Sequence, residues 1–500
     1  MVVFSKINSA QPDLLKAEGI NVETDLTRGL HSFSIIGLPD KSIEESRDRV
    51  SAAIKNSGFV SPKQKNHKII ISLTPANIKK SGSIFDLPIA IGYLKSSNQI
   101  NINTLDKLLV GELSLDGKVK KIKGVIQIIL YAKEKGFKEV YIPYENKDEA
   151  SVINGIKIYG VKNLNEITLH LEKKKFIGEI VTKNILKTIE IKNNFKDIKG
   201  NRESKRALLI AACGGHNICL YGPPGTGKTL LSKAFCEILP PLNYKEVLEV
   251  SSIHSITENS KGLLTNPPFR NPHHTASYSA IIGGGRDINP GEITLAHKGV
   301  LLMDEFPEFD NRVINSLRQP MEEKVVRISR ASKRVEYPCD FILVSTLNPC
   351  PCGFKNSDVK ECKCSSKEIE NYKRKLSGPI LDRIDIFTKV SKINYNKLMS
   401  KENEISSTEI SKIVAYTRNL QLERFKKLNN DLEHKELIEN IEDINIIDEF
   451  NKISEKLNIS TRSYYKILKV SRTIADINKS KQIKMPHILE ALQYRNNLNY

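Results

Sequence analysis

Apolar and polar positions follow different periods in successive parts of the chain. Over residues 1–170, short β-branched runs such as HKIIISLTPA, KEVYIPY and GIKIYGV alternate with helical patterns such as IEESRDRVSAAIKNSG. Strands that alternate with helices predict an α/β or α+β domain. The Lys-rich residues 171–194 predict a linker with one strand-like segment.

The second half of the chain shows two further patterns. Strand and helix signals alternate again over residues 195–392, which predicts a second α/β domain. Over residues 393–500 the period is helical throughout, in TEISKIVAYTRNLQLERF, STRSYYKILKVSRTIADI and KMPHILEALQYRNN. This last region predicts a small helical domain that packs on the second one.

Length and composition agree with this division. A chain of 500 residues is too long for one core, so two or three domains are expected. Hydrophobic content of 39% and charged content of 27% are ordinary, but the formal net charge of +19 is not. Such a charge favours a polyanionic partner, nucleic acid before a membrane surface. A Lys-, Asn- and Ile-rich proteome would also raise basic charge everywhere.

The sequence predicts a cytosolic protein with no membrane partner. No run approaches the roughly 18 apolar residues of a membrane helix, and MVVFSKINSAQPDLLKAEG has no signal-peptide core. The eight cysteines do not belong to a small stapled module, which suits a reducing compartment.

A phosphate-binding pattern lies in the segment NICLYGPPGTGKTLLSKAF, between an apolar strand and an amphipathic helix. Glycines allow successive backbone N–H groups to face the β- and γ-phosphates at the positive end of the new helix. Lys228 supplies a cation to the same oxygens, and the Thr229 hydroxyl is offered to Mg²⁺. The predicted nucleotide-binding residues are Gly222, Pro223, Pro224, Gly225, Thr226, Gly227, Lys228 and Thr229.

An acidic pair completes the pattern in KGVLLMDEFPEF. Residues Val300 to Met303 predict a buried strand, after which Asp304 would hold Mg²⁺ through water and Glu305 would polarise the attacking water. Adjacent acids at a strand end are also typical of a solvated turn, but the upstream phosphate loop favours catalysis. ATP and Mg²⁺ are therefore the predicted cofactors.

The order GPPGTGKTLL, DEFPEF, NPCPCG and SGPILDRIDI resembles the magnesium-chelatase-like AAA+ ATPases. Within them, GGHNICLYGPPGTGKT, RNPHHTASYSAIIGGG and KVSRTIADI resemble stretches of the YifB/ComM family, and the likeness covers nearly the whole chain. The resemblance implies an AAA+ P-loop α/β core over 195–392 and a helical lid of the magnesium chelatase C-terminal type over 393–500.

The same resemblance implies roles for single residues. Asn348, after the strand DFILVSTLN, matches sensor 1 and would orient the lytic water. Arg383 matches the arginine finger, which reaches the γ-phosphate of a neighbouring subunit. Arg462 matches sensor 2, with Arg472 as the runner-up; either also suits an ordinary surface arginine. Because an arginine that acts in trans requires a ring, a homohexamer is implied.

The N-terminal region resembles the Lon-type domain, an α+β fold of the ribosomal S5 domain 2-like kind. Lon peptidases cut with a Ser-Lys dyad, and the serine would fall near Ser83. The lysine should follow Gly124 by a few residues, but VIQIIL there contains no base. The domain is therefore predicted to be non-proteolytic, a DNA-binding or assembly module.

A basic hairpin is predicted in EKVVRISRASKRVEYPCDFIL, which reads as strand, basic turn, strand. Its cations fall within eleven residues free of acids: Lys324, Arg327, Arg330, Lys333 and Arg334. In related ring motors a hairpin here, and another in the long interval after the phosphate loop, face the pore. A basic tip can follow phosphates without reading bases, although a solvated hairpin has the same pattern. The pair His273 and His274 suits a nucleotide, a metal or a structural role.

Four of the cysteines form two short pairs, Cys350-x-Cys352 and Cys362-x-Cys364, nine residues apart. Four thiolates on a loop can close tetrahedrally on Zn²⁺. The C-x-C spacing, in place of the commoner C-x-x-C, also fits reduced thiols in a loop. The other four, at positions 213, 219, 236 and 339, lie in apolar runs and are predicted to be core.

Three functions are compatible with these features. The first is an ATP-hydrolysing hexameric motor on single-stranded or branched DNA, a helicase or branch-migration enzyme, linked through the family to recombination and natural transformation. The second is a chelatase-like ATPase that remodels a protein partner. The third is a scaffold or ATP-dependent protease, which the intact acids and the missing lysine oppose.

Overall fold

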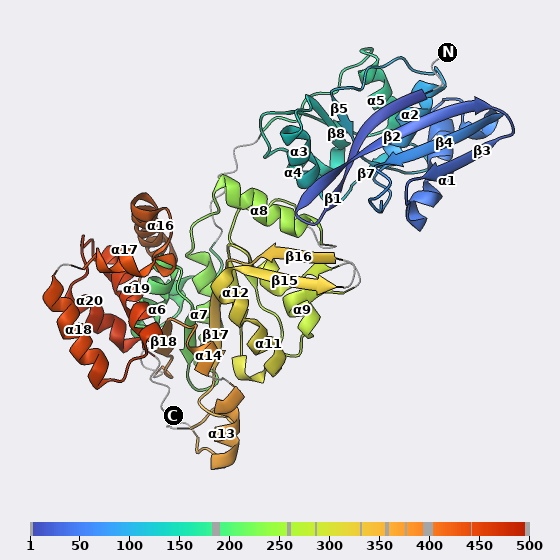
Figure 1. Cartoon of the computed structure of the whole chain (residues 1–500). Helices are drawn as coiled ribbons and strands as arrows, with labels where there is room; N and C mark the ends of the chain where they lie inside the picture. Colours follow the sequence, from blue (N-terminus) through green and yellow to red (C-terminus); the bar gives the residue numbers. More distant parts are fainter. Residues whose placement is uncertain are drawn as a thin grey trace. The chain divides into compact units, whose positions relative to one another are not determined.

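The computed structural model describes residues 4–182, 191–257, 262–285, 288–330, 333–355, 360–375, 378–393, 404–441 and 443–495. Part of the predicted linker, with any strand in residues 183–190, lies outside them. The chain divides into two compact units (Figure 1). Unit 1 consists of Met1–Leu186 with Val247–Leu264, and unit 2 of Lys187–Glu246 with Thr265–Tyr500.

Unit 1 is built on a mixed sheet with the strand order β3-β4-β2-β1-β5-β8-β9. β1 and β2 pair antiparallel, from Phe4 opposite Asp25 to Asp13 opposite Lys16, while β5, β8 and β9 run parallel. The strands are β1 (Phe4–Asp13), β2 (Lys16–Arg28), β3 (Ser32–Ile36), β4 (His67–Thr74), β5 (Lys107–Leu109), β8 (Glu139–Pro143) and β9 (Lys157–Val161).

The sequence pattern located β4, β8 and β9 but not the β1–β2 hairpin. The reason is that Ser5, Ser9 and Gln11 occupy buried positions of β1, so its buried face does not read as hydrophobic. The helices of this unit are α1 (Lys41–Asn56), α2 (Asp86–Ser96), α3 (Val125–Glu134), α4 (Lys147–Ala150) and α5 (Leu164–Leu171).

A segment from the middle of the chain packs within unit 1. Most of helix α8 (Tyr244–Ser255) belongs to it, and Leu248 and Leu263 pack against the core of unit 1. The buried Gln127 of α3 donates to the Ser252 carbonyl at 2.8 Å and accepts from the Ser255 hydroxyl at 3.1 Å. Gln127 is the polar residue of VIQIIL, the stretch in which the catalytic lysine of a Lon-type peptidase was sought. Its side chain hydrogen-bonds to the α8 segment.

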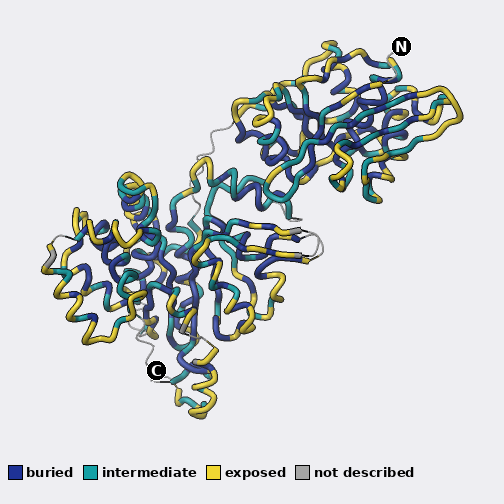
Figure 2. Tube along the Cα trace, in the orientation of Figure 1, coloured by how far each residue is buried: buried dark blue, intermediate teal, exposed yellow. Residues whose placement is uncertain are grey.

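Unit 2 contains a five-stranded sheet with the order β11-β14-β17-β10-β18, and every pairing in it is parallel. The strands are β10 (Ile218–Tyr221), β11 (Phe269–Arg270), β14 (Val300–Met303), β17 (Ile342–Leu347) and β18 (Ile386–Lys389). β14 and β17 are buried along their whole length, and the tube in Figure 2 is dark blue through the interior of this unit. The α/β class with a parallel sheet is confirmed, and β14 has the predicted bounds.

Two short hairpins pack together beside this sheet. They consist of β12 (Gly283–Gly284) with β13 (Asn289–Pro290), and β15 (Val325–Arg330) with β16 (Lys333–Pro338). The Tyr337 hydroxyl of β16 donates to the Ile288 carbonyl at 2.7 Å. A Cβ added to Gly283 would come within 2.9 Å of the Ile328 side chain, so glycine permits this close approach.

The C-terminal part of unit 2 is helical, with α16 (Ser407–Phe425), α17 (His434–Ile438), α18 (Ile444–Lys456), α19 (Thr461–Ile477) and α20 (Met485–Gln493). These helices share one hydrophobic core with the parallel sheet and with α6 (Arg202–Gly214). Arg206 of α6 pairs with Glu490 of α20 at 2.9 Å. The helical region is thus joined to the sheet by apolar packing and ion pairs.

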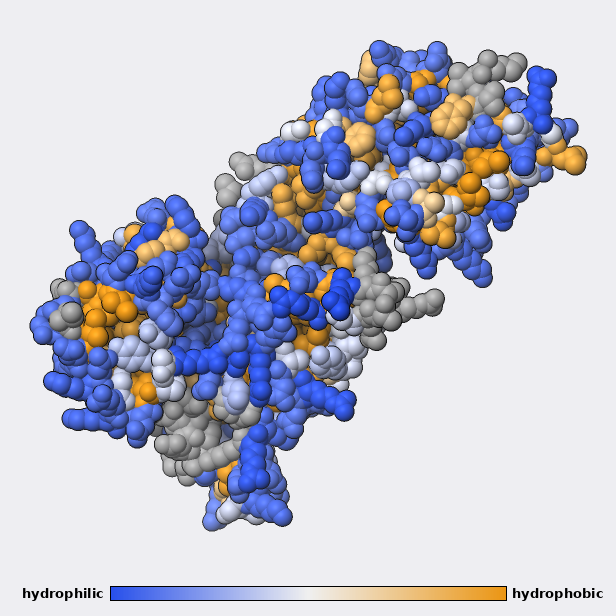
Figure 3. All heavy atoms as spheres, in the orientation of Figure 1, coloured by the Kyte–Doolittle hydropathy of each residue, from blue (hydrophilic) through white to orange (hydrophobic). Residues whose placement is uncertain are grey.

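Among the described residues, none of the helices has the length and apolar character that crossing a membrane requires. On the face drawn in Figure 3, hydrophilic side chains cover most of the surface and apolar ones are scattered among them.

Candidate nucleotide-binding site

The glycine-rich turn follows β10 at the carboxyl edge of the parallel sheet, and Lys228 is the first residue of α7 (Lys228–Glu237). Gly225 and Gly227 have φ of 74° and 90°, a backbone conformation that favours glycine. A Cβ on Gly222 would come within 2.1 Å of the Val390 carbonyl oxygen. The turn therefore needs glycine both for its curvature and for its packing beside β18.

Lys228 lies inside this turn, with only 8% of its surface exposed. Its ammonium donates to the carbonyls of Gly222 at 2.7 Å and Pro223 at 2.8 Å, and to Asn348 Oδ1 at 3.1 Å. Burial lowers the pKa of Lys228, and the nearby charges of Asp304 and Glu305 act in the opposite direction. The structure thus places the predicted lysine and the predicted sensor-1 asparagine in contact.

The acidic pair follows β14 at the same edge. Asp304 accepts hydrogen bonds from the hydroxyls of Thr229, at 2.9 Å, and of Thr346. The backbone N–H of Glu305 donates to Thr346 at 3.0 Å, and Glu305 has a positive φ of 52°. A carboxylate beside a hydroxyl is a ligand set that suits Mg²⁺, which prefers oxygen ligands. Thr346 was not predicted; the available signal was a hydroxyl at the end of a buried apolar strand.

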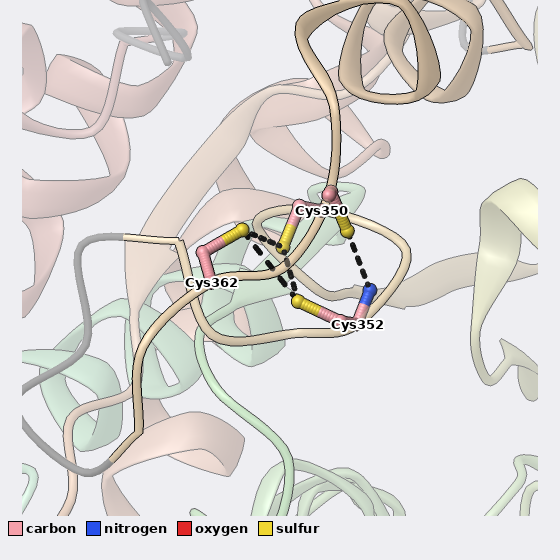
Figure 4. A group of neighbouring side chains, drawn as sticks. Cys350, Cys352 and Cys362 are labelled. Carbon is pink, nitrogen blue, oxygen red and sulfur yellow. Dashed lines mark hydrogen bonds between the residues drawn. The ribbon is translucent and has the colours of Figure 1, made fainter.

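The four predicted metal-binding cysteines also come together, just beyond Asn348. Their sulfur atoms all lie within 4.8 Å of one another, at 3.4 Å for Cys350–Cys352 and 3.6 Å for Cys352–Cys362. Figure 4 shows the sulfurs of Cys350, Cys352 and Cys362 turned toward one another. The backbone N–H of Lys355 donates to Cys350 Sγ at 3.3 Å. Zinc–sulfur bonds of about 2.3 Å in a tetrahedron separate the sulfurs by about 3.8 Å, close to this spacing.

The two arginines given nucleotide roles lie together at one carboxylate. Glu322 accepts from Arg383 Nη2 at 2.8 Å and forms an ion pair with Arg462 of α19. Arg383 also donates to the Arg318 and Pro379 carbonyls. Burial lowers the pKa of Arg383. Glu322, at the end of α12 (Arg318–Glu323), was missed by sequence reasoning because nothing in its local pattern distinguishes it from Glu323.

This arginine pair lies at the edge of the sheet opposite the glycine-rich turn. β10 and β18 run parallel with Ile218 beside Ile386 and Tyr221 beside Lys389. The turn follows Tyr221, whereas Arg383 precedes β18, and its carbonyl accepts from Asn217 at the start of β10. The three residue steps from Ile218 to Tyr221 alone separate the two ends by about 10 Å. Arg383 therefore lies at the end of the sheet opposite the glycine-rich turn of its own chain.

Arg472, the alternative sensor-2 residue, and the pair His273 and His274 make contacts within the chain that favour structural roles. Arg472 is fully buried and bonds to Asp476 at 2.7 Å and to the Ser480 and Lys481 carbonyls. His273 Nδ1 lies 2.8 Å from the Thr275 hydroxyl, and its ring packs at a tilt against that of His274, with centroids 4.2 Å apart. Arg472 thus braces the end of α19, and the histidines form a local ring pair.

Two members of the predicted basic hairpin are engaged within the chain. Lys324 pairs with Asp340 at 3.0 Å and with Asp431 at 2.6 Å. Arg327 lies opposite Glu336 in the hairpin register, and their side chains pair at 2.8 Å. Arg334 is exposed, and the side chains of Arg330 and Lys333 lie outside the described part. Lys324 and Arg327 are therefore neutralised by acids that lie outside the eleven acid-free residues, one of them on the opposite strand of the hairpin.

In unit 1, the serine near the expected peptidase position also has a partner. The Ser83 hydroxyl donates to the carboxylate of Glu112. The nearby Lys80 is buried, and its ammonium donates to the Pro75 carbonyl.

A parallel α/β sheet that carries a glycine-rich turn, a lysine at a helix start and an acidic strand end defines the class of P-loop nucleotide-binding proteins. The chain matches the family described as "Magnesium chelatase, subunit ChlI" over residues 194–398. It also matches "Subunit ChlI of Mg-chelatase" over 22–146 and "Magnesium chelatase, subunit ChlI C-terminal" over 404–495. The protein belongs to the YifB/ComM family of magnesium-chelatase-like AAA+ ATPases.

Relatives support this assignment along the whole chain. "Competence protein ComM" of Haemophilus influenzae is 39% identical over 505 residues, which cover 99% of this chain and 97% of that protein. "Uncharacterized protein YifB" of Escherichia coli is 36% identical over 498 residues, with 96% and 95% covered. "DNA replication licensing factor Mcm6" of Drosophila melanogaster is 23% identical over 336 residues, with 61% and 37% covered.

The Glu305→Gln variant is expected to bind ATP with unchanged affinity but to lose turnover by about 100-fold or more, because the amide cannot accept a proton from water. Titration with a fluorescent ATP analogue and a phosphate-release assay would measure the two effects. Glu423→Gln, the same change on an exposed residue of α16, is the control. Turnover within about threefold of wild type in Glu305→Gln would contradict the assigned role.

Proposed function

We propose that this chain hydrolyses ATP with Mg²⁺ as a ring-forming motor that acts on DNA. The main support for a ring is that Arg383 and the glycine-rich turn lie at opposite ends of the strands of one sheet. A ring of identical subunits places one edge of each protomer against the other edge of its neighbour. Each ATP site would then combine the turn and acids of one subunit with the arginines of the next.

Within such a site the residues have distinct tasks. Lys228 and the backbone N–H groups of the turn would bind the β- and γ-phosphates, and Thr229 with Asp304 would hold Mg²⁺, which would offset the negative charge of the phosphates. Glu305 accepts a proton from the attacking water, which Asn348 orients. Arg383 and Arg462 from the neighbour neutralise charge that develops on the transferred phosphoryl group.

DNA is the proposed track because of the charge of +19 and the basic end of the β15–β16 hairpin. Deep-blue, strongly hydrophilic side chains gather over this hairpin in Figure 3. Since Lys324 and Arg327 have acidic partners in the chain, we assign phosphate contact to Arg330, Lys333 and Arg334. Cations at a hairpin end can bind successive phosphates of single-stranded or branched DNA without sequence preference.

The relatives suggest the process. Because one is named a competence protein, we propose a role in DNA recombination during natural transformation, as a helicase or branch-migration motor. A homohexamer is the assembly we propose.

Unit 1 would act as a Lon-like module without a catalytic dyad, since Gln127 binds Ser252 and Ser255 where a base is required. The C-terminal helices would form the lid that carries Arg462, and the four cysteines would bind structural Zn²⁺.

The test of DNA coupling is ATP hydrolysis with and without single-stranded, forked and four-way DNA. We expect DNA to stimulate turnover and the stimulation to fall steeply with salt. The double variant Arg330→Glu/Arg334→Glu should keep basal turnover but need at least about tenfold more DNA, with a salt slope lower by about one per lost phosphate contact.

Lys452→Glu/Lys456→Glu supplies the matched control, because it reverses two exposed charges on α18, away from the hairpin. An equal loss of DNA stimulation in both double variants would show that only net charge matters and would remove the hairpin from the proposal. Basal hydrolysis that no DNA stimulates would instead favour the alternative, a chelatase-like ATPase that remodels a protein partner.

A further inference from the structure

The segment that carries the four cysteines begins just after strand β17, beyond Asn348, and continues into helix α13 (Ser366–Lys375). Cys350 is buried, while Cys352, Cys362 and Cys364 are partly exposed. The backbone N–H of Cys352 donates to Cys364 Sγ at 3.4 Å, so each cysteine pair is tied to the other. We call the part from Cys350 to Lys375 the cysteine module; residues 356–359 within it are outside the described part.

The cysteine module packs directly against the phosphate-binding turn. Gly353 has φ of 82°, and a Cβ added to it would come within 2.6 Å of the Pro224 ring and 3.8 Å of the Asn348 side chain. Its N–H donates to the Cys350 carbonyl at 2.9 Å, in a tight turn. The backbone immediately after the first cysteine pair therefore lies against both the glycine-rich turn and Asn348, which contacts Lys228.

Helix α13, at the C-terminal end of the cysteine module, also contacts residues beside the glycine-rich turn. Tyr372 of α13 is buried and hydrogen-bonds to the backbone of Asn348; burial raises its pKa. Lys375, at the end of α13, lies 3.6 Å from Glu308, three residues beyond Glu305. One module thus contacts the phosphate-binding turn, the end of β17 and the turn after β14.

We propose that a zinc ion bound by the four cysteines braces the ATP site, so that metal loading of the cysteine module sets the rate of ATP turnover. The inference rests on the proposed ATPase and assigns it a structural regulator. The four sulfurs, from two chain segments, lie within 4.8 Å of one another, as the ligands of one tetrahedral ion do, and such an ion would join the two segments with four bonds. Without the ion, Gly353 and Tyr372 lose their anchor, and Asn348 and Lys228 lose fixed positions. Displacement of about 1 Å at such a site can reduce turnover by about 100-fold.

The experiment measures metal and turnover separately. Purified wild-type protein should contain about one zinc per chain, and cobalt substitution should give the absorption of a tetrahedral thiolate site. The double variant Cys352→Ser/Cys364→Ser should contain almost no zinc and lose at least about tenfold in turnover. Cys236→Ser, at a partly buried cysteine on α7 outside the module, should keep both values.

Two further measurements distinguish a specific effect of zinc on the ATP site from a general loss of folding. Reversible removal of zinc with a chelator should lower turnover in the wild-type chain, and added zinc should restore it. Tyr372→Phe should keep its zinc but lower turnover several-fold, because only the link to Asn348 is lost.

Each result bears on one claim. A zinc-free wild-type protein with no cobalt thiolate absorption would overturn the metal site. Unchanged turnover after zinc loss, in a protein that does hydrolyse ATP, would overturn the brace and leave the proposed function standing. A fully loaded protein without any ATP hydrolysis would overturn the proposed function, and the brace with it, while the zinc content would still stand as measured.

Discussion

Lys228→Ala is expected to abolish nucleotide use. The lysine side chain contacts two carbonyls of the glycine-rich turn and Asn348 together, and it would supply the positive charge that the β- and γ-phosphates require. Its removal should weaken ATP binding by at least about 100-fold, because both the charge and the geometry of the turn are lost. Binding of a fluorescent ATP analogue and a phosphate-release assay would measure this.

Lys233→Ala is the matched control, since Lys233 lies on the same helix α7 but is exposed. It should bind and hydrolyse ATP as the wild type does. A melting curve for each variant shows whether the fold survives. ATP affinity within about threefold of wild type in a folded Lys228→Ala protein would exclude the P-loop as the nucleotide site.

Arg383→Ala should spare ATP binding and reduce hydrolysis by about 1000-fold or more, the effect expected of an arginine that stabilises only the transition state. The physical reason is its position at the amino edge of the sheet, remote from the turn of its own chain. Arg312→Ala, at an exposed arginine of α11 (Asn311–Ser316), is the control and should hydrolyse ATP normally.

Mixed rings decide whether Arg383 acts on the neighbour. Lys228→Ala and Arg383→Ala subunits are each expected to be inactive alone, but an equimolar random mixture should form about a quarter of its interfaces with an intact turn on one side and an intact arginine on the other. Partial recovery of hydrolysis is therefore expected. Mixtures that form rings but recover nothing would count against action in trans.

Much of the nucleotide site was readable from the chain because it is local. The turn Gly222–Thr229 and the pair Asp304–Glu305 are short contiguous motifs whose flanking apolar runs already indicate strand or helix. The strand β14 has the bounds that its apolar run predicts. The convergence of the four cysteines was also expected from their spacing, and the structure brings their sulfurs together.

The contacts that the sequence could not supply are those between distant segments. Nothing near Glu322 indicates that it would bind both Arg383 and Arg462, because these residues come from three separate elements. The eleven residues from Lys324 to Arg334 contain no acid, yet Lys324 pairs with Asp431, which is more than a hundred positions away in the sequence. Nothing in the local sequence indicated that Tyr372 would contact Asn348 or that Gly353 would pack against Pro224.

By itself, the sequence determined the family, the α/β class of unit 2, and the position of the glycine-rich turn and of the acidic pair, because periodicity and contiguous motifs are properties of neighbouring residues. Only the tertiary structure decided which edge of the sheet each group occupies, which cations are already paired, and that α8 packs in unit 1. Those outcomes depend on which strands and helices pair across long separations, and burial and charge neutralisation select such pairings only once the whole chain has folded.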